Sequence, residues 1–336
     1  MEYYDDYDLK YPDLVMEILD YFAICKGMNE KSVGKFCELH AKKNEKGSEF
    51  IYQPAIVDRI CQELCKKNRL TVIRSGSALG FDNNYGFVIR NKQIWENNYQ
   101  RNRNYYNSLV YGFEYIYRSY KEIVVPLVWQ KGDDFSAGTG FKLFGGIVTA
   151  RHCIDDPTQL SIKGFAAEEL QKSKIYVSSN PALDIAFIDV EKDEGLGDYT
   201  DNGRVMQDVL VMGYPQIPAF TDFLTAEKAT ISSKAEARIT PTKGSIAAYG
   251  ENIFSKVELM LIAAKIRGGN SGGPVINEEG SIVGVSCQKP YYDDKIGDYD
   301  DLGYGIAVPI SCLIEIIEKK EATIEKDKNF FQDWPM

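Results

Sequence analysis

The stretch Gly268-Gly269-Asn270-Ser271-Gly272-Gly273-Pro274-Val275 decides the fold that we expect of this chain. Glycines on both sides of a serine, followed by a proline, disfavour both a helix and a regular strand. The pattern favours a tight loop that presents the Ser271 hydroxyl and points backbone N–H groups toward the same place. Because a serine hydroxyl is a weak nucleophile until a base removes its proton, the loop predicts a base elsewhere in the chain.

The chain has two histidines, His40 and His152. His40 stands in the polar and basic stretch 39–43, which is typical of a solvated helix face. His152 follows the apolar run 146–149, so an expected strand delivers it at its exit. A lone histidine is more often structural or exposed than catalytic, but a carboxylate in a suitable place supports His152 as the base.

That carboxylate is Asp184, which stands at the head of an apolar strand predicted from residue 185 onward. From there it can accept the Nδ1–H of a histidine ring and fix the tautomer. The alternative is a turn aspartate that caps the strand. Asp189, five residues further along, is the rival carboxylate. Side chains alternate along a strand, so Asp189 points to the opposite face from Asp184 and is the weaker candidate.

Three short blocks carry a resemblance to a known family. Residues 149–153 (Thr-Ala-Arg-His-Cys), 183–186 (Leu-Asp-Ile-Ala) and 269–274 (Gly-Asn-Ser-Gly-Gly-Pro) resemble the signature blocks of trypsin-like serine proteases, in that family's order. The chain is most similar to the HtrA/Deg type, for which the serine block and a late strand such as 302–310 are typical. The resemblance covers roughly residues 121–320 and implies a serine endopeptidase with a mainly β fold of two six-stranded β-barrels.

The resemblance also implies a role for each matched residue. Ser271 would attack the scissile carbonyl, His152 would take the serine proton and pass it to the leaving amine, and Asp184 would orient His152. The backbone N–H groups of Gly269 and Ser271 would form the oxyanion hole. Glycine suits the first position because the loop needs unusual φ/ψ values there. We expect no cofactor and no metal ion.

The chain departs from the digestive branch of that family at Asn270. That branch has an aspartate there, which pairs with a newly freed N-terminal amine. Asn270 cannot form this ion pair, so activation by N-terminal cleavage is disfavoured. Cys153 stands where secreted members place a disulfide cysteine, but the nearest cysteine upstream is Cys65, so we expect no bridge. The chain after residue 320 is too short for the PDZ domain typical of HtrA proteins, so none is expected.

The substrate pocket is expected between residues 264–267 and 284–288, which contain no acidic side chain. The following loop, 291–301, is strongly acidic and borders the pocket in the family. It could attract basic substrates by electrostatic steering, or be an ordinary solvated loop. A calcium site is the least favoured reading, because the spacing does not match an EF-hand loop.

The composition is that of a globular protein, with 44% hydrophobic and 26% charged residues among 336, a length that favours two domains. No long apolar run or secretory signal is present, which predicts a cytoplasmic protein without a membrane span. Seven cysteines, an odd number, fit free thiols in a reducing compartment. Cys61 and Cys65 are spaced for one helical face, but no second pair suggests zinc.

The N-terminal half predicts three helices followed by two strands. The helices are expected over residues 12–26, 30–43 and 54–68, and the strands over 70–74 and 85–90. This order resembles a small α+β winged helix-turn-helix, in pattern only. The expected domains are a winged-helix-like domain at 1–95, a linker at 96–115, a protease domain at 116–320 and a C-terminal tail at 321–336.

Charge is unevenly distributed along the chain. The net charge is −10, yet residues 26–103 carry fifteen Lys and Arg against eight Asp and Glu. Basic side chains cluster in residues 54–92, around the third helix and the wing, where a DNA-binding member would meet phosphates. The alternative is a domain that docks a protein partner or dimerises.

Three functions are therefore open. The first is an intracellular serine endopeptidase whose N-terminal domain selects a substrate, partner or location. The second is a regulator in which the protease fold only binds, which the complete triad disfavours. The third is a protease that stays latent until DNA or a regulatory protein activates it.

Overall fold

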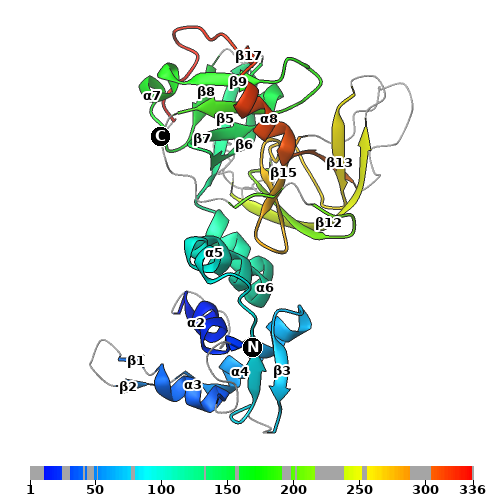
Figure 1. Cartoon of the computed structure of the whole chain (residues 1–336). Helices are drawn as coiled ribbons and strands as arrows, with labels where there is room; N and C mark the ends of the chain where they lie inside the picture. Colours follow the sequence, from blue (N-terminus) through cyan, green and yellow to red (C-terminus); the bar gives the residue numbers. More distant parts are fainter. Residues whose placement is uncertain are drawn as a thin grey trace, which may run out of the picture. The chain divides into compact units, whose positions relative to one another are not determined.

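The computed structural model describes residues 11–24, 31–40, 42–43, 49–50, 52–76, 80–131, 134–155, 159–190, 198–200, 203–215, 238–251, 256–287 and 304–334. The chain divides into two compact units, Met1–Tyr115 and Ile116–Met336 (Figure 1). No helix among the described residues is both long and apolar enough to cross a membrane.

The first unit is built from helices packed around one apolar core. Its elements are α2 (Leu14–Tyr21), α3 (Val33–Leu39), β1 (Lys42–Lys43), β2 (Glu49–Phe50), α4 (Pro54–Lys66), β3 (Thr71–Arg74), β4 (Asn84–Gly86) and α5 (Lys92–Asn97). Ser32 begins α3 by accepting a hydrogen bond from the Lys35 N–H at 3.2 Å. Pro54 begins α4, where its missing N–H costs no helical hydrogen bond. Ile18 and Ile60 are fully buried between these helices.

Two predicted boundaries in this unit were wrong. The helix expected over 30–43 ends at Leu39, because Lys42–Lys43 pair antiparallel with Glu49–Phe50. The helix expected over 12–26 ends at Tyr21. Beyond it, the Ile24 N–H donates to the carbonyl of Phe87 at 2.9 Å, so the chain contacts the strand predicted over 85–90. A local hairpin therefore limits one helix and a long-range contact follows the other, and the winged-helix assignment itself stays a prediction.

The segment expected to be a linker, residues 96–115, is largely helical. It holds the end of α5 and most of α6 (Tyr99–Tyr120), which is broken at Gly112, where φ is +69°. Tyr106 and Tyr111 pack against the apolar core of the first unit. The aromatic side chains therefore make this segment part of that unit.

The second unit begins with a seven-stranded sheet in the order β17-β9-β10-β7-β6-β5-β8, which we call the first sheet. Its elements, with the two short helices between them, are β5 (Val124–Lys131), β6 (Asp134–Leu143), β7 (Gly146–Thr149), η2 (Arg151–Cys153), β8 (Gln159–Ile162), α7 (Ala167–Lys172), β9 (Lys174–Val177), β10 (Ala186–Asp189) and β17 (Ala322–Thr323). Leu127, Ile147 and Ile188 are fully buried in its core.

The remaining strands form a closed barrel in the order β11-β12-β13-β16-β15-β14. They are β11 (Asp208–Gly213), β12 (Thr240–Glu251), β13 (Glu258–Ile262), β14 (Pro274–Asn277), β15 (Ile282–Ser286) and β16 (Gly305–Pro309), and α8 (Ile310–Lys319) follows. Two six-stranded barrels were expected. The second has this strand number, whereas the first sheet has a seventh strand.

The seventh strand comes from the C-terminal strap, residues 321–334, which was expected to be a tail outside the protease domain. Figure 1 shows it running from β17 toward α7. Ala322 pairs with Val177 of β9, and Phe331 bridges to Leu160 of β8. Phe330 and Phe331 are buried in the core of the first sheet. The strap therefore joins β9 to β8, the strands that would otherwise be the free edges of the first sheet.

Candidate active site

His152 and Asp184 lie against each other at one end of the first sheet. His152 is in η2, directly after β7, and Asp184 lies two residues before β10, the antiparallel neighbour of β7. Asp184 Oδ2 is 2.7 Å from His152 Nδ1, and Oδ1 accepts the backbone N–H of His152 at 2.9 Å. Since a carboxylate only accepts, Nδ1 carries the ring proton and Nε2 is left to accept one.

Two opposing effects set the pKa of His152. Burial favours the neutral imidazole and lowers the pKa, whereas the hydrogen bonds to Asp184 and Cys153 and their charges raise it. The net result is a pKa well above the usual value of 6.5. His152 is therefore a strong base whose neutral form becomes populated only toward alkaline pH.

Ser271 lies in the loop directly before β14 and is 8% exposed. Within the part of the chain that the structure describes, the backbone N–H groups of Gly269 and Ser271 donate no hydrogen bond. Gly269 has φ of +95°, the left-handed region that favours glycine. Of the three predicted catalytic side chains, only His152 and Asp184 are joined by a hydrogen bond among the described residues.

The serine loop packs against the chain that leads to His152. Gly272 has φ of +88°, and a Cβ atom there would lie 2.1 Å from the Thr139 carbonyl oxygen and 2.7 Å from Ala150 N. Ala150 precedes His152 by two residues. The residue after the serine must therefore be glycine, and this close approach brings the serine loop beside η2.

Both halves of the second unit hold the loop. From β15, the Ser286 hydroxyl donates to the Asn270 carbonyl at 2.7 Å. From β6, the Thr139 N–H donates to the Ser271 carbonyl at 2.9 Å, and its hydroxyl donates to the Gly269 carbonyl at 2.6 Å. The sequence interpretation missed Thr139 and Ser286. In the sequence, Thr139 is distinguished only by its place between two glycines, and this pattern does not indicate a catalytic role.

Asn270 is 2% exposed, and its Oδ1 has no hydrogen-bond partner among the described residues. A Cβ atom on Gly213 would lie 2.8 Å from this oxygen, so the side chain faces the end of β11. An aspartate here would bury a negative charge, which costs free energy unless a cation pairs with it. The neutral amide avoids this cost.

In the expected pocket segment 264–267, Lys265 and Arg267 are exposed, whereas Ala264 and Ile266 belong to the buried core of the barrel. Ala264 is fully buried, and Ile266 is 4% exposed. A Cβ atom on Gly305 would lie 2.4 Å from Ile266 Cδ1, so Ile266 packs directly on β16. Gln288 and the acidic loop 291–301 lie outside the described residues.

Asp189 and His40, the alternatives to Asp184 and His152, make contacts outside the candidate site. Asp189 pairs with Lys320 at 3.5 Å, at the far end of β10 from Asp184. His40 lies in the first unit, stacks on Phe36 with 4.2 Å between ring centroids, and its Nδ1 is 3.0 Å from the Phe36 carbonyl. These contacts give both residues structural roles.

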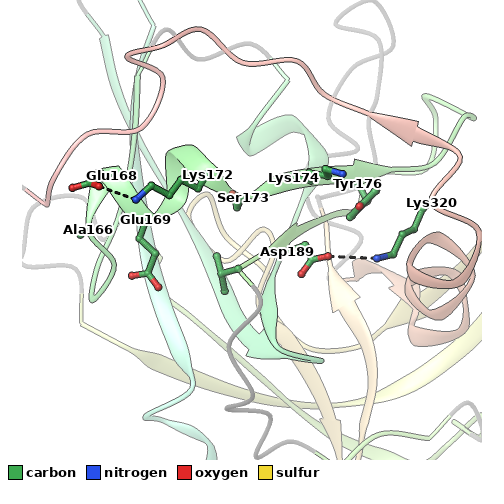
Figure 2. Close-up of a pocket in the computed structure, with 10 residues that line it drawn as sticks. Ala166, Glu168, Glu169, Lys172, Ser173, Lys174, Tyr176, Asp189 and Lys320 are labelled. Atoms are coloured by element: carbon green, nitrogen blue, oxygen red, sulfur yellow. Dashed lines mark hydrogen bonds and ion pairs between the residues drawn. The ribbon is translucent and has the colours of Figure 1, made fainter.

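A groove of about 660 Å³ lies beside α7, β9 and β10 (Figure 2). It contains Asp189 but none of the predicted catalytic residues. Its charges pair with one another, since Lys172 contacts Glu168 at 2.7 Å and Lys320 contacts Asp189. The groove is therefore separate from the site around His152.

No metal centre is visible in the described residues, which hold no group of three or more His, Cys, Asp or Glu side chains suited to an ion. Cys61 is fully buried on α4, and burial raises the pKa of its thiol, which disfavours the thiolate that zinc would need. Six cysteines lie in the described residues, and all six are free thiols.

Comparison with known proteins agrees with the fold of the second unit. Residues 138–285 match the family model of the trypsin-like peptidase domain. "Protease Do-like 2, chloroplastic" of Arabidopsis thaliana is 29% identical over 172 residues, 48% of this chain and 25% of that protein. "Serine protease Do-like HtrA" of Lactococcus lactis is 26% identical over 196 residues, 56% of this chain and 45% of that protein. The chain thus spans less than half of the length of these relatives.

A solved structure has a similar chain path. The active form of the Rv3671c protease from M. tuberculosis is 19% identical, with a TM-score of 0.45, over 64% of this chain and 88% of that one. The sequence comparisons support a trypsin-like, HtrA-related serine protease domain, and the matched family region, residues 138–285, lies within the second unit.

Proposed function

We propose that the second unit is the catalytic part of a serine endopeptidase of the HtrA type that hydrolyses peptide bonds of protein substrates. The observation that carries this proposal is the double contact between His152 and Asp184, which keeps the proton of the neutral imidazole on Nδ1 and makes Nε2 the acceptor. Support for the HtrA type is the serine block at 269–273 together with relatives that are 25–29% identical.

The proposed reaction has two halves, formation of the acyl-enzyme and its hydrolysis by water. Ser271 Oγ forms a bond to the scissile carbonyl carbon while its proton moves to His152 Nε2. The oxyanion accepts hydrogen bonds from the N–H groups of Gly269 and Ser271. His152 then gives its proton to the leaving amine as the C–N bond breaks. Water attacks the acyl-enzyme in the same way, with His152 again as the base, and releases Ser271.

The direct test is proteolysis of an unfolded protein such as casein by the full chain and by its Ser271→Ala variant. The proposal predicts cleavage by the wild type and loss of cleavage in the variant, with equal thermal stability of the two. Ser271→Ala removes only the nucleophile, so equal cleavage by both proteins contradicts the proposal.

A second candidate function concerns the first unit, for which we propose recognition of DNA through residues 54–92. One face of α4 is exposed at Arg59, Gln62 and Lys66, side chains suited to phosphates and base edges. The surrounding segment 26–103 has an excess of basic residues. In the alternative form of this proposal the same surface docks a regulatory protein, and the protease stays latent until the partner or DNA binds.

This candidate is tested with the Ser271→Ala full chain and a DNA duplex at several salt concentrations. DNA binding predicts affinity that falls steeply with salt and weakens in Arg59→Ala. Lys243→Ala in the second unit is the control, because Lys243 is equally charged and 60% exposed. Failure to bind at low salt favours the protein-docking form. Casein cleavage with and without the duplex then separates a latent protease from a constitutive one.

We also propose a reducing, cytoplasmic setting. Its support is the odd number of cysteines, seven, with six free thiols in the described residues.

A further inference from the structure

Thr139 is a fully buried residue of β6 that touches the serine loop at two points. Its hydroxyl lies 2.6 Å from the Gly269 carbonyl oxygen, and its N–H donates to the Ser271 carbonyl at 2.9 Å. The same hydroxyl lies 2.8 Å from the backbone nitrogen of Tyr214, directly after β11. Thr149 of β7 fixes the Thr139 carbonyl in turn, at 2.7 Å.

The direction of these hydrogen bonds follows from their donors. The Tyr214 N–H can only donate, so the Thr139 oxygen accepts from it and its single proton goes to the Gly269 carbonyl. A continuous chain therefore runs from Tyr214 through one hydroxyl to Gly269. Serine can make the same chain, whereas valine has the same shape as threonine and can make neither bond.

The two carbonyls that Thr139 holds belong to Gly269 and Ser271, whose N–H groups donate no hydrogen bond among the described residues. Gly269 has the greater conformational freedom of the two, because a glycine at positive φ can also adopt a broad region at negative φ. Rotation of the Gly269 carbonyl turns the neighbouring peptide planes. The N–H groups of Gly269 and Ser271 then no longer point toward the same place. A fixed carbonyl prevents this rotation.

We propose that Thr139 is a positioning residue for the oxyanion hole, and that its hydroxyl couples the end of β11 at Tyr214 to the hole. The inference rests on the proposed function and adds to it a residue outside the triad and outside the serine loop. Thr139 does not touch the reacting atoms, so its effect is on the rate of the chemical step and much less on substrate binding.

The test compares four variants with the full-length wild type. Thr139→Val removes the hydroxyl at constant shape, and Thr139→Ser keeps the hydroxyl. Thr139→Ala and Thr139→Ser both lose the methyl group and differ only in the hydroxyl, so this pair decides the matter if Thr139→Val does not fold. Thr242→Val in β12 is the control, because among the described residues the Thr242 hydroxyl contacts the Val211 carbonyl alone, at 3.5 Å. The measurements are the rate of labelling by a fluorophosphonate, and kcat and KM for casein.

We expect Thr139→Val and Thr139→Ala to label and turn over roughly ten- to a hundredfold more slowly, less than the loss of an oxyanion donor itself, with KM changed by less than about threefold. Thr139→Ser and Thr242→Val stay within about threefold of wild type. Folded Thr139→Val or Thr139→Ala with wild-type rates, or Thr139→Ser as slow as Thr139→Ala, overturns the positioning role. A wild type that neither labels nor cleaves contradicts the proposed function, and the positioning role with it.

Discussion

Both oxygens of the Asp184 carboxylate are occupied by His152, one by the ring Nδ1 at 2.7 Å and the other by the backbone N–H at 2.9 Å. The backbone contact fixes where the carboxylate lies, and the ring contact fixes which way the imidazole faces. This arrangement sets both the tautomer and the pKa of the proposed base.

Asp184→Asn is expected to inactivate the protein without unfolding it. An amide has one oxygen and one NH₂ group, so it cannot accept from both His152 nitrogens and it favours the wrong tautomer. The expected loss is roughly 10⁴-fold in kcat, as found when the aspartate of a catalytic triad is replaced in this way. Casein hydrolysis gives the rate, and circular dichroism checks the fold.

Asp189→Asn is the matched control on the same strand. Asp189 pairs with Lys320 at the far end of β10 from Asp184, in the groove that contains none of the proposed catalytic residues. Near wild-type activity in this variant, beside an inactive Asp184→Asn, is the expected pattern. Equal loss in both variants contradicts the assignment of Asp184.

The raised pKa of His152 predicts an alkaline pH optimum. The general base must be neutral, so kcat/KM rises as pH increases through the pKa of His152, with a midpoint above 6.5. The same shift makes the protonated form stabilise the fold. That stability is fully present below the unfolded-state pKa and is lost as pH rises through the folded-state pKa.

A pH–rate profile and an NMR titration in a His40→Gln background, which leaves a single histidine, measure this pKa independently. Asp184→Asn lowers it, since the carboxylate is the main group that raises it. A midpoint at or below the usual histidine value in the wild type is the contrary result.

Gly272 and Gly268 form a matched pair for testing the serine loop. Alanine at 272 would meet Thr139, Thr149 and Ala150 at 2.1 to 2.7 Å and would also hold a positive φ of +88°, which costs about 1–3 kcal/mol before any steric clash. Alanine at 268 would meet nothing within 4 Å. We expect Gly272→Ala to be inactive and less stable and Gly268→Ala to resemble wild type, by casein cleavage and thermal melting. An active Gly272→Ala contradicts the described loop geometry.

The sequence predicted the parts of the site that short motifs carry. His152, Asp184 and Ser271 each stand in a block whose chemistry is visible in the residue types themselves. Thr139 was not predictable in this way, because its role depends on a carbonyl 130 positions away that its hydroxyl meets at 2.6 Å.

The same reason explains the fold features that the sequence did not predict. β17 has two residues, too few for a periodic pattern, and exists because it pairs with β9. In the sequence, Phe330 and Phe331 are aromatic residues near the end of the chain. Their place in the core follows from the pairing of Phe331 with Leu160 of β8. The helix expected to continue to residue 43 ends at Leu39, and Lys42–Lys43 instead form a short strand that pairs with Glu49–Phe50.

The C-terminal strap gives a prediction about stability. Phe331 is 3% exposed in the core of the first sheet, so Phe331→Ala should lower the free energy of unfolding by about 3–5 kcal/mol. Tyr304→Ala is the control, because Tyr304 is 44% exposed in the same unit, and it should change stability little. Urea denaturation of both variants measures the difference. A Phe331→Ala variant as stable as the control contradicts the strap's place in the core.

The central claim is that Ser271 is a nucleophile activated by His152. Its most direct test is intact-mass and peptide-mapping analysis of the full chain after treatment with a fluorophosphonate at mildly alkaline pH. The account predicts one adduct, on Ser271, that is absent in Ser271→Ala and strongly slowed in His152→Ala. An unlabelled wild type, or an adduct on another residue, contradicts it.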